Sequence, residues 1–441
     1  MAAIDASVYE KFIIESADGS TTVNLAEGVA MFSYFEDIFS PTITAKAYIV
    51  NDGNTIEGPE GKMTSVYNGL PIRGGERVMI KIAGNSPDNP GMDFSEDVTM
   101  YFYVSSIRNV LQDTKSESFV LELVPRETIT NETSRVGKKF KSTTPISDSV
   151  KDIVKNYLKT DKLNDDNVDK TQNPYGFLGN LRKPFTILTW LASKSVPGTS
   201  GKDDATAGYL FFQTVDGYHF KSIDSLIEAD PYSVKYIYSQ VVQANEQSND
   251  FRILKYSTNK NQDLLGNLKR GAYCSHRMFF NPLTFTYTNP EKGLFKMEDY
   301  QGKTENLGKD ITLPGLGDDS DKTLGDIPSR NITAVMDIGT LEKNASMKDN
   351  ADPTKIFSQV MMRYNTTLTQ TMSMTIPSNT NLRAGDLIEC QFPSIDRQLT
   401  GSTDSEQSGL YMIKELCHYF DATGSYTSLK LLRDTFGSKA K

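Results

Sequence analysis

The sequence predicts a mainly β protein with an α+β middle region, built from two β-barrel domains with α+β domains between them. The first observation behind this is a pattern of alternating strands that occurs near both ends of the chain. The second is a composition rich in Thr, Ser, Asn and Tyr, which fits strands and loops better than helical bundles. A chain of 441 residues also suggests about three domains.

The repeat organises the rest of the chain. Residues 74–82 match residues 384–392: a small residue and Gly precede an acid, and apolar residues then occupy every second position. The later parts also correspond, with a one-residue slip between them: 103–107 with 412–416, and 121–123 with 429–431. We interpret the two stretches as copies of one small β-domain. Because identity between them is low, chance resemblance is the alternative.

Two Gly-acid pairs stand at the same place in the two copies, Gly75-Glu76 and Gly385-Asp386. A turn that leads into a strand needs Gly for its backbone angles. We therefore expect Gly75, Glu76, Gly385 and Asp386 to shape the barrels and to have no catalytic role.

Residues 1–128 are predicted to form the first barrel. Thr42–Val50 alternates between apolar and polar residues, which is typical of a half-buried strand, and further short strands follow as far as Val124. Met31–Phe39 is dense in aromatic residues around Glu36 and Asp37. This strand could place its aromatic residues in the core, or it could be an edge offered to a partner.

Residues 129–230 are predicted to form an α+β domain. Thr144-Pro145 provides an N-cap candidate with Pro at the first helical position, and apolar residues recur at helical spacing from Ile146 to Leu158. A second helix is expected from Pro184. Asp216-Gly217 predicts the turn of a β-hairpin, because both residues tolerate a positive φ.

Residues 231–330 are predicted to be a β-rich segment that ends in a long loop at 305–330, where Gly, Asp and Pro are frequent. Residues 331–441 are predicted to be the second barrel. A short helix from Asp352-Pro353 to about Tyr364 precedes its strands, and a polar insertion, Ser394–Ser408, interrupts them.

The charge pattern and the N-terminus exclude several classes of protein. The net charge of −9, with no cluster of Lys and Arg, argues against duplex binding as the main task. Three widely spaced cysteines give no disulfide framework. The first residues do not resemble a secretory signal, and no apolar run approaches the roughly 20 residues of a membrane span. We therefore expect a soluble protein made in a cytoplasm.

The sequence predicts no catalytic residue, no cofactor and no metal site. The nucleophile and zinc motifs that carry recognised chemistry do not occur. Cys274 with His276, or Cys417 with His418, could bind a metal, but neither has a second pair at matching spacing. The paired carboxylates of a glycosidase stay open, because their separation depends on the fold.

Short motifs across most of the chain resemble phage baseplate hub proteins. The resemblance is nearest to the central hub of T-even-type contractile tails, with late control protein D and the VgrG hub of type VI secretion as relatives. The motifs are Tyr34–Asp37 with Leu70–Glu76 for the first barrel, Phe185–Ser193 with Gly208–Phe220 for the middle segment, and Leu382–Ile388, Ser408–Ile413, His418 and Tyr426–Arg433 for the closing barrel. This chain is longer than the T-even hub, which leaves the function of its loops open.

The resemblance implies a structural protein without catalysis that carries two tube-like barrels. Three subunits would form a pseudo-sixfold ring that joins the sixfold tail tube to the threefold central spike and surrounds the DNA channel. It implies a homotrimer whose partners are the spike protein, the tube or tube-initiator proteins and neighbouring wedge proteins. Double-stranded DNA would pass without specific binding, and no membrane anchor is expected.

The same resemblance implies a place in the virion tail baseplate, after assembly in the host cytoplasm. In the family the second barrel can be discontinuous, so Val234–Tyr256 is a candidate to pair with the C-terminal strands. Two alternatives remain: a β-rich glycan-degrading enzyme, phage-borne or secreted, and a glycan-binding tail module.

Overall fold

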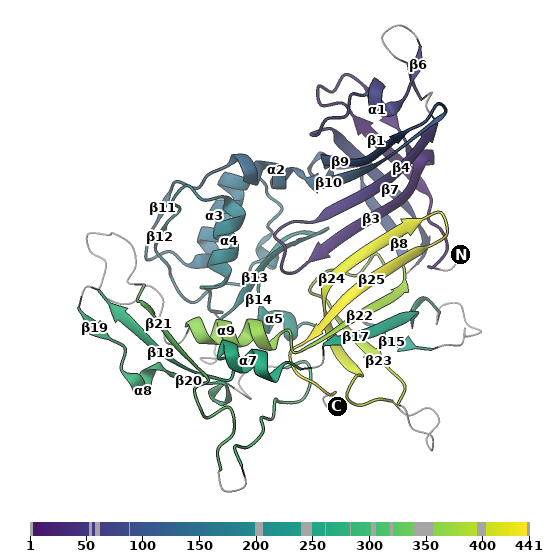
Figure 1. Ribbon diagram of the computed structural model, residues 1–441. Helices are drawn as coiled ribbons and strands as arrows, with labels where there is room; N and C mark the ends of the chain where they lie inside the picture. The colour runs from purple at the N-terminus through teal and green to yellow at the C-terminus, as the bar shows by residue number, and fades with distance from the viewer. Residues whose placement is uncertain are drawn as a thin grey trace.

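The computed structural model describes most of the chain (Figure 1): residues 3–52, 55–57, 62–87, 89–198, 206–239, 249–260, 262–282, 284–300, 306–317, 321–337, 356–394 and 403–438. The protein is mainly β, with a middle region of helices and short strands, as predicted. Two predicted features lie largely outside these residues: the start of the helix at Asp352-Pro353, and most of Ser394–Ser408.

The first barrel is formed by the N-terminal strands. Its principal strands run in the order β2-β1-β7-β9-β10-β4-β3, and β8 pairs with β7 on the same edge as β9. Their bounds are β1 Tyr9–Glu15, β2 Thr22–Asn24, β3 Val29–Asp37, β4 Thr44–Asp52, β7 Arg77–Ser86, β8 Asn89–Phe94, β9 Phe102–Gln112 and β10 Ser116–Pro125. The segment between β4 and β7 contains β5 Ile56–Glu57, β6 Met63–Thr64 and α1 Val66–Gly69.

The second barrel combines two separate parts of the chain. Its strands are β15 Tyr236–Tyr238, β16 Arg252–Ile253, β17 Lys255–Lys260, β22 Gln370–Pro377, β23 Leu387–Gln391, β24 Gly409–Asp421 and β25 Ser425–Arg433. β15 runs parallel to β23, and β17 runs antiparallel to β22. The strands at 236–260 therefore belong to the same sheet as the C-terminal strands, although more than a hundred residues separate them in sequence.

The two barrels are joined strand to strand. β3, at one edge of the first barrel, pairs antiparallel with β24 of the second, from Asp37 opposite Glu415 to Met31 opposite Asp421. The first interpretation of this aromatic strand is confirmed, because Phe32 and Tyr34 are fully buried in the core. Its backbone edge pairs within the chain, with the other barrel. One apolar core extends through both barrels.

The middle domain packs beside the barrels with its own apolar core (Figure 1). Its elements are α2 Arg126–Thr133, β11 Lys139–Phe140, α3 Ile146–Ile153 with the π-helical turn Val154–Leu158, β12 Phe177–Leu178, α4 Pro184–Ala192, β13 Tyr209–Thr214, β14 Gly217–Ser222 and α5 Ile223–Ile227. The helix from Pro184 forms as predicted, and so does the hairpin. Its two turn residues are Val215 and Asp216, one position earlier than predicted, because Gly217 already pairs with Thr214. The predicted cap of α3 is wrong: Pro145 occupies the N-cap, no side chain caps the helix, and the helix begins at Ile146.

A fourth region lies between the two parts of the second barrel. In its sheet, β18 Cys274–Asn281 pairs along one edge with β21 Arg330–Val335 and along the other with β19 Thr286–Tyr287 and β20 Leu294–Lys296, one at each end. Three helices accompany it: α7 Leu264–Arg270, α8 Pro290–Gly293 and α9 Ile356–Thr366. β21 pairs in parallel with β18 rather than with the C-terminal strands. Residues 306–317 and 321–329 contain no helix or strand, which fits the expected loop.

Candidate functional site

The two Gly-acid turns make the same backbone hydrogen bonds in the two barrels. The Gly75 N–H donates to the Val104 carbonyl at 2.8 Å, and the Val104 N–H donates to the Glu76 carbonyl at 2.9 Å. In the second barrel the Gly385 N–H donates to the Ile413 carbonyl at 2.8 Å, and the Ile413 N–H donates to the Asp386 carbonyl at 2.9 Å.

The side chains of the two acids close the turns that precede them. Glu76 accepts the backbone N–H of Arg73 at 2.7 Å, and Asp386 accepts the backbone N–H of Arg383 at 2.8 Å. The glycine of each pair has a positive φ, +94° at Gly75 and +98° at Gly385, which a residue with a Cβ rarely adopts. Each turn thus needs both its glycine and its acid.

The correspondence continues along the strands that follow. Val104 pairs with Leu123 as Ile413 pairs with Leu431, and in each barrel the register then shifts at the next residue. After the shift, Ile107 pairs with Leu121 as Leu416 pairs with Leu429. Both barrels therefore contain the same β-bulge. The one-residue slip in the sequence has a different origin, because β9 has a second register shift, between its pairings with Val120 and Ser118, that β24 lacks. The strand pairing confirms the repeat.

The barrels also share their strand order. The first reads β7-β9-β10-β4-β3 and the second reads β23-β24-β25-β22-β17. Position by position, β9 corresponds to β24 and β3 corresponds to β17. The joining strands β3 and β24 therefore come from different places in the repeat, so the two barrels are arranged head to tail.

The joined barrels present one continuous wall of eight strands, in the order β9-β10-β4-β3-β24-β25-β22-β17. One face of this wall is the apolar core, and the other is polar, since successive residues of a strand point to opposite faces. On the polar face Glu122 lies between Arg108, at 3.1 Å, and Lys46, at 3.8 Å. We call the paired strands β3 and β24 the seam. On the second-barrel side of this seam, Glu415 pairs with Lys430 at 2.6 Å. These bases of the polar face are each paired with an acid.

Glu36 fastens the seam from inside. This β3 residue is buried, and its carboxylate accepts the Tyr34 hydroxyl at 2.7 Å, the Val215 N–H at 2.8 Å and the Ala384 N–H at 2.9 Å. One side chain thus connects the first barrel, the β13–β14 turn and the Gly385 turn of the second barrel. Burial raises the pKa of Glu36 to about 7, although the three hydrogen bonds and Arg383 oppose the shift.

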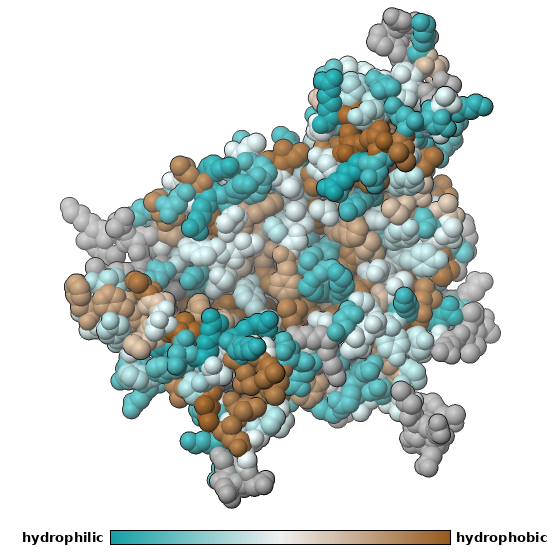
Figure 2. Space-filling view, in the orientation of Figure 1, coloured by the Kyte–Doolittle hydropathy of each residue, from teal (hydrophilic) through white to brown (hydrophobic). Residues whose placement is uncertain are grey.

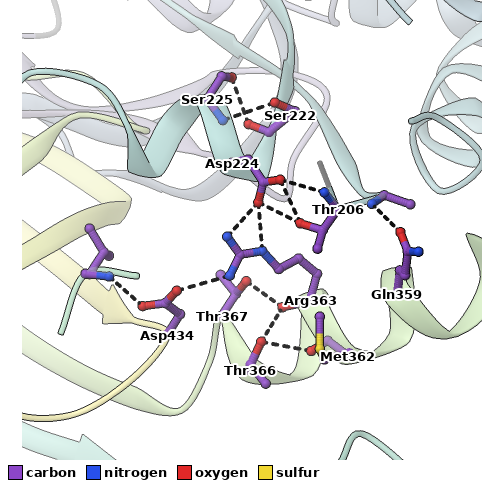
Figure 3. Close-up of polar contacts among 12 residues, drawn as sticks. Thr206, Ser222, Asp224, Ser225, Gln359, Met362, Arg363, Thr366, Thr367 and Asp434 are labelled. Carbon is purple, nitrogen blue, oxygen red and sulfur yellow. Dashed lines mark hydrogen bonds and ion pairs between the residues drawn. The ribbon is translucent and has the colours of Figure 1, made fainter. Parts of the chain in front are cut away.

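A buried ionic network fixes the second barrel to the middle domain (Figure 3). Arg363 of α9 donates to Asp224 of α5 at 2.6 and 3.0 Å, and to Asp434, just after β25, at 3.2 Å. Asp224 also accepts the backbone N–H of Thr206, and Asp434 accepts that of Leu307. Arg363 thus pairs with two buried carboxylates. Removal of its guanidinium would leave Asp224 and Asp434 buried without this cation.

The N-terminal segment closes the other end of the seam. The Tyr9 hydroxyl donates to the Phe420 carbonyl of β24 at 2.9 Å. The Ser425 N–H donates to the Ile4 carbonyl at 3.0 Å, and the hydroxyls of Ser7 and Ser425 lie 2.8 Å apart. The chain preceding the first barrel therefore binds the β24–β25 turn of the second.

Side chains that bind metals do not form a cluster in the part of the chain that the structure describes. No group of three or more His, Cys, Asp and Glu side chains gathers there as a metal site would require. Cys417 and His418 are neighbours on β24, so their side chains point to opposite faces, and that of His418 is fully buried. Among the described helices, none is long and apolar enough to span a membrane.

No protein-family profile matches the sequence, and no curated protein sequence matches it. Solved structures do match. The prophage MuSo2 43 kDa tail protein from Shewanella oneidensis aligns with 96% of this chain and 98% of its own, at a TM-score of 0.50 and 9% identity. A tail protein from Neisseria meningitidis MC58 aligns over 96% of both chains, at a TM-score of 0.49 and 11% identity. A type VI secretion system component from E. coli aligns over 94% and 76%, at 0.43 and 7%.

The first of these likenesses shows that the chain has the fold of a prophage tail protein. The predicted resemblance to phage tail proteins is confirmed at the level of fold. The sequence did not identify the partners of Glu36 or the Arg363 network, because these contacts join residues far apart in the chain. One signal was present for Glu36: in a strand it shares a face with Phe32 and Tyr34, which indicates that its carboxyl points into the core.

Proposed function

We propose that this protein is the structural hub of a contractile phage tail baseplate, where three copies form a pseudo-sixfold ring. The observation that carries the proposal is the head-to-tail junction of two equivalent barrels through β3 and β24. A threefold ring of such chains presents six similar barrels, and it can therefore contact a sixfold tube on one side and a threefold spike on the other.

The continuous wall is the proposed lining of the DNA channel. Its polar face pairs acids with bases, as with Glu122 and Arg108, and the chain is acidic overall. Duplex binders gain affinity when clustered Lys and Arg release counterions from phosphates. A wall without such a cluster lets double-stranded DNA pass without specific binding. The proposed partners are the central spike protein, tube or tube-initiator proteins and neighbouring wedge proteins.

Within this proposal the four turn residues Gly75, Glu76, Gly385 and Asp386 shape the barrels, one pair in each. The strand pairing supports a first barrel within residues 1–128 and a second barrel made from 236–260 together with 370–433. The middle domain and the β18 sheet flank this ring. We place the assembled protein in the virion tail, after assembly in the host cytoplasm and without a membrane anchor.

The native mass of the purified protein tests the proposal when it is measured across a concentration series, with and without the candidate spike protein. We expect a trimer, and electron microscopy should show rings with a central hole and a pseudo-sixfold outline. A chain that stays monomeric at every concentration, even with the spike protein present, would contradict the hub. Turnover of cell-wall or capsule polymers would instead favour the glycan-degrading alternative.

A further inference from the structure

The repeat contains one complete barrel-to-barrel seam and the two halves of a second. The complete seam joins β3 to β24 within the chain. Since β3 corresponds to β17 and β24 corresponds to β9, the equivalent seam would join β17 to β9. Within one chain these two strands form opposite ends of the eight-stranded wall, so they can meet only between two copies.

Both of these edges are unpaired in the described part of the chain. From Ser105 to Gln112, β9 pairs only with β10, and β17 pairs only with β22. An unpaired edge offers a row of backbone donors and acceptors to another strand. The β9 edge also exposes apolar side chains: Leu111 is 68% exposed and Val110 is 37% exposed. In Figure 2 an apolar area interrupts the hydrophilic surface of the first barrel.

We infer that the β17 edge of one copy pairs antiparallel with the β9 edge of the next, in the register of the β3–β24 seam. The inference rests on the proposed function, because it takes the ring of three copies as given and names the strands that close it. Such a contact is heterologous, with different surfaces on the two sides, which is the type that generates closed rings.

The internal seam fixes which residues would face each other. The strands β3 and β17 can be aligned because each pairs with an equivalent neighbour, β4 in the first barrel and β22 in the second. In this alignment Ser33 corresponds to Ser257, and Met31 corresponds to Lys255. Through the pairings with β10 and β25, Leu111 corresponds to Tyr419. In the complete seam Tyr419 faces Ser33. In the new seam Leu111 therefore faces Ser257 of the next copy.

Charge supports the same register. Asp113 of the first barrel corresponds to Asp421 of the second, since each comes directly after the last paired residue, Gln112 or Phe420. Each also donates its backbone N–H across the hairpin, to the carbonyl of Ser116 or Gly424. In the complete seam Asp421 faces Met31, so in the new seam Asp113 faces Lys255 of the next copy. Both Asp113 and Lys255 are exposed in the single chain. The match places opposite charges across the seam, which stabilises a pair of facing strands.

The β9 edge differs from β24 in one respect. It has a second register shift, around Asn109, whose φ of 51° is positive. A bulge at an edge limits pairing with arbitrary strands, because it interrupts the regular row of hydrogen bonds. This edge therefore favours a partner of one particular shape over general aggregation.

A disulfide between two copies tests the seam. The double variant Leu111→Cys with Ser257→Cys places the two thiols opposite each other, and facing strands have Cα separations within the range that a disulfide spans. The matched control is Ser106→Cys with Ser257→Cys, because Ser106 lies about 13 Å further along the same edge. Under mild oxidation we expect covalent dimers and trimers of the first variant on a non-reducing gel, and none of the control.

The native mass of the unmodified protein, measured in parallel, distinguishes failure of the β17–β9 seam from failure of the three-copy ring. Trimers of the native protein without cross-links in Leu111→Cys with Ser257→Cys would overturn the inference and leave the hub intact. Cross-links of equal yield in both variants would overturn the register. A native protein that stays monomeric, with neither variant cross-linked, would overturn the ring and the seam together.

A charge exchange tests the register by a different route. Asp113→Lys alone and Lys255→Asp alone each place like charges across the seam, and we expect each to raise the concentration of half-assembly roughly twofold to fivefold. The double variant restores the opposite pair and should assemble like the native protein. If the double variant instead combines the assembly losses of the two single variants, so that its concentration of half-assembly is higher than that of either, the two residues do not face each other.

Discussion

The two barrels have the same strand order, the same turn and the same bulge, but they are held in place differently. The first is formed by one continuous stretch, and a Cβ on its turn glycine, Gly75, would meet nothing within 4 Å. The second is assembled from two stretches, and a Cβ on Gly385 would lie 3.3 Å from the Phe212 ring of the middle domain. One turn is open and its equivalent is covered.

This difference separates two sources of structure. Local pattern is enough to set strand and turn geometry, because the two barrels agree although their sequences differ almost everywhere. A barrel of this kind does not have to be formed by one continuous stretch of chain. The fourth region lies between β17 and β22 in sequence, and these two strands still pair. The discontinuous barrel instead depends on contacts from outside it, above all those of Arg363 and Glu36.

The largest effect is expected from Arg363→Leu. The substitution leaves Asp224 and Asp434 buried without their cation, and breaking a buried ion pair in this way typically costs about 3–5 kcal/mol. The matched control is Arg77→Leu in the first barrel, where Arg77 is 49% exposed beside Glu15, so that the loss should stay below about 1 kcal/mol. Thermal unfolding of both variants measures the contrast, and equal shifts of Tm would refute it.

Glu36 is expected to make stability depend on pH. Its folded-state pKa of about 7 lies above the ordinary 4.5, so the folded protein binds the proton more tightly than the unfolded chain. The contribution of Glu36 to the free energy of unfolding is therefore highest below pH 4.5, and it falls by roughly 3 kcal/mol as pH rises to 7.

Glu36→Gln removes this titration while keeping the shape of the side chain. We expect the Tm of the native protein, relative to that of Glu36→Gln, to decrease between pH 4.5 and pH 7. Melting curves recorded every half unit of pH would show it. Parallel Tm profiles of the two proteins would mean that the Glu36 carboxyl titrates as it does in solvent.

The smallest effects should distinguish the two turns directly. Gly75→Ala and Gly385→Ala both place a Cβ at a positive φ, which costs about 1–2 kcal/mol. Gly385→Ala must in addition displace Phe212, and overpacking of this kind adds roughly 1 kcal/mol or more. The second variant should therefore unfold at the lower temperature. The reverse order would show that the covered turn adapts more easily than the open one.

Sequence reasoning reached the fold through features that are local. The Gly-acid turn, the alternation of Arg77–Ile82 and the hairpin around Asp216-Gly217 each depend on a few neighbouring residues, and all of them form. Such patterns also revealed the extra residue of β9, as a slip between two otherwise matching stretches.

Other features could not be predicted because they depend on contacts between distant residues. The sequence gives no register for β3 against β24, and no sign that Arg363 meets Asp224 and Asp434. Within the predicted β-rich segment the position of β18 could not be assigned, because Cys274–Asn281 includes the buried Arg277, which breaks the apolar alternation. The N-cap at Pro145 was misplaced by one residue, since Pro fits the first turn of a helix at more than one position.

The β3–β24 seam also has a consequence for the kinetics of assembly. Two separate barrels that meet in solution lose translational and rotational freedom, and this entropy opposes their association. Within one chain that loss is already part of folding, and the second barrel is present at a high effective concentration beside the first. In the proposed ring, junctions within a chain alternate with junctions between chains. Those within a chain would thus exist before any encounter between molecules. Assembly would then need three partners to meet rather than six, so it could proceed at lower protein concentration.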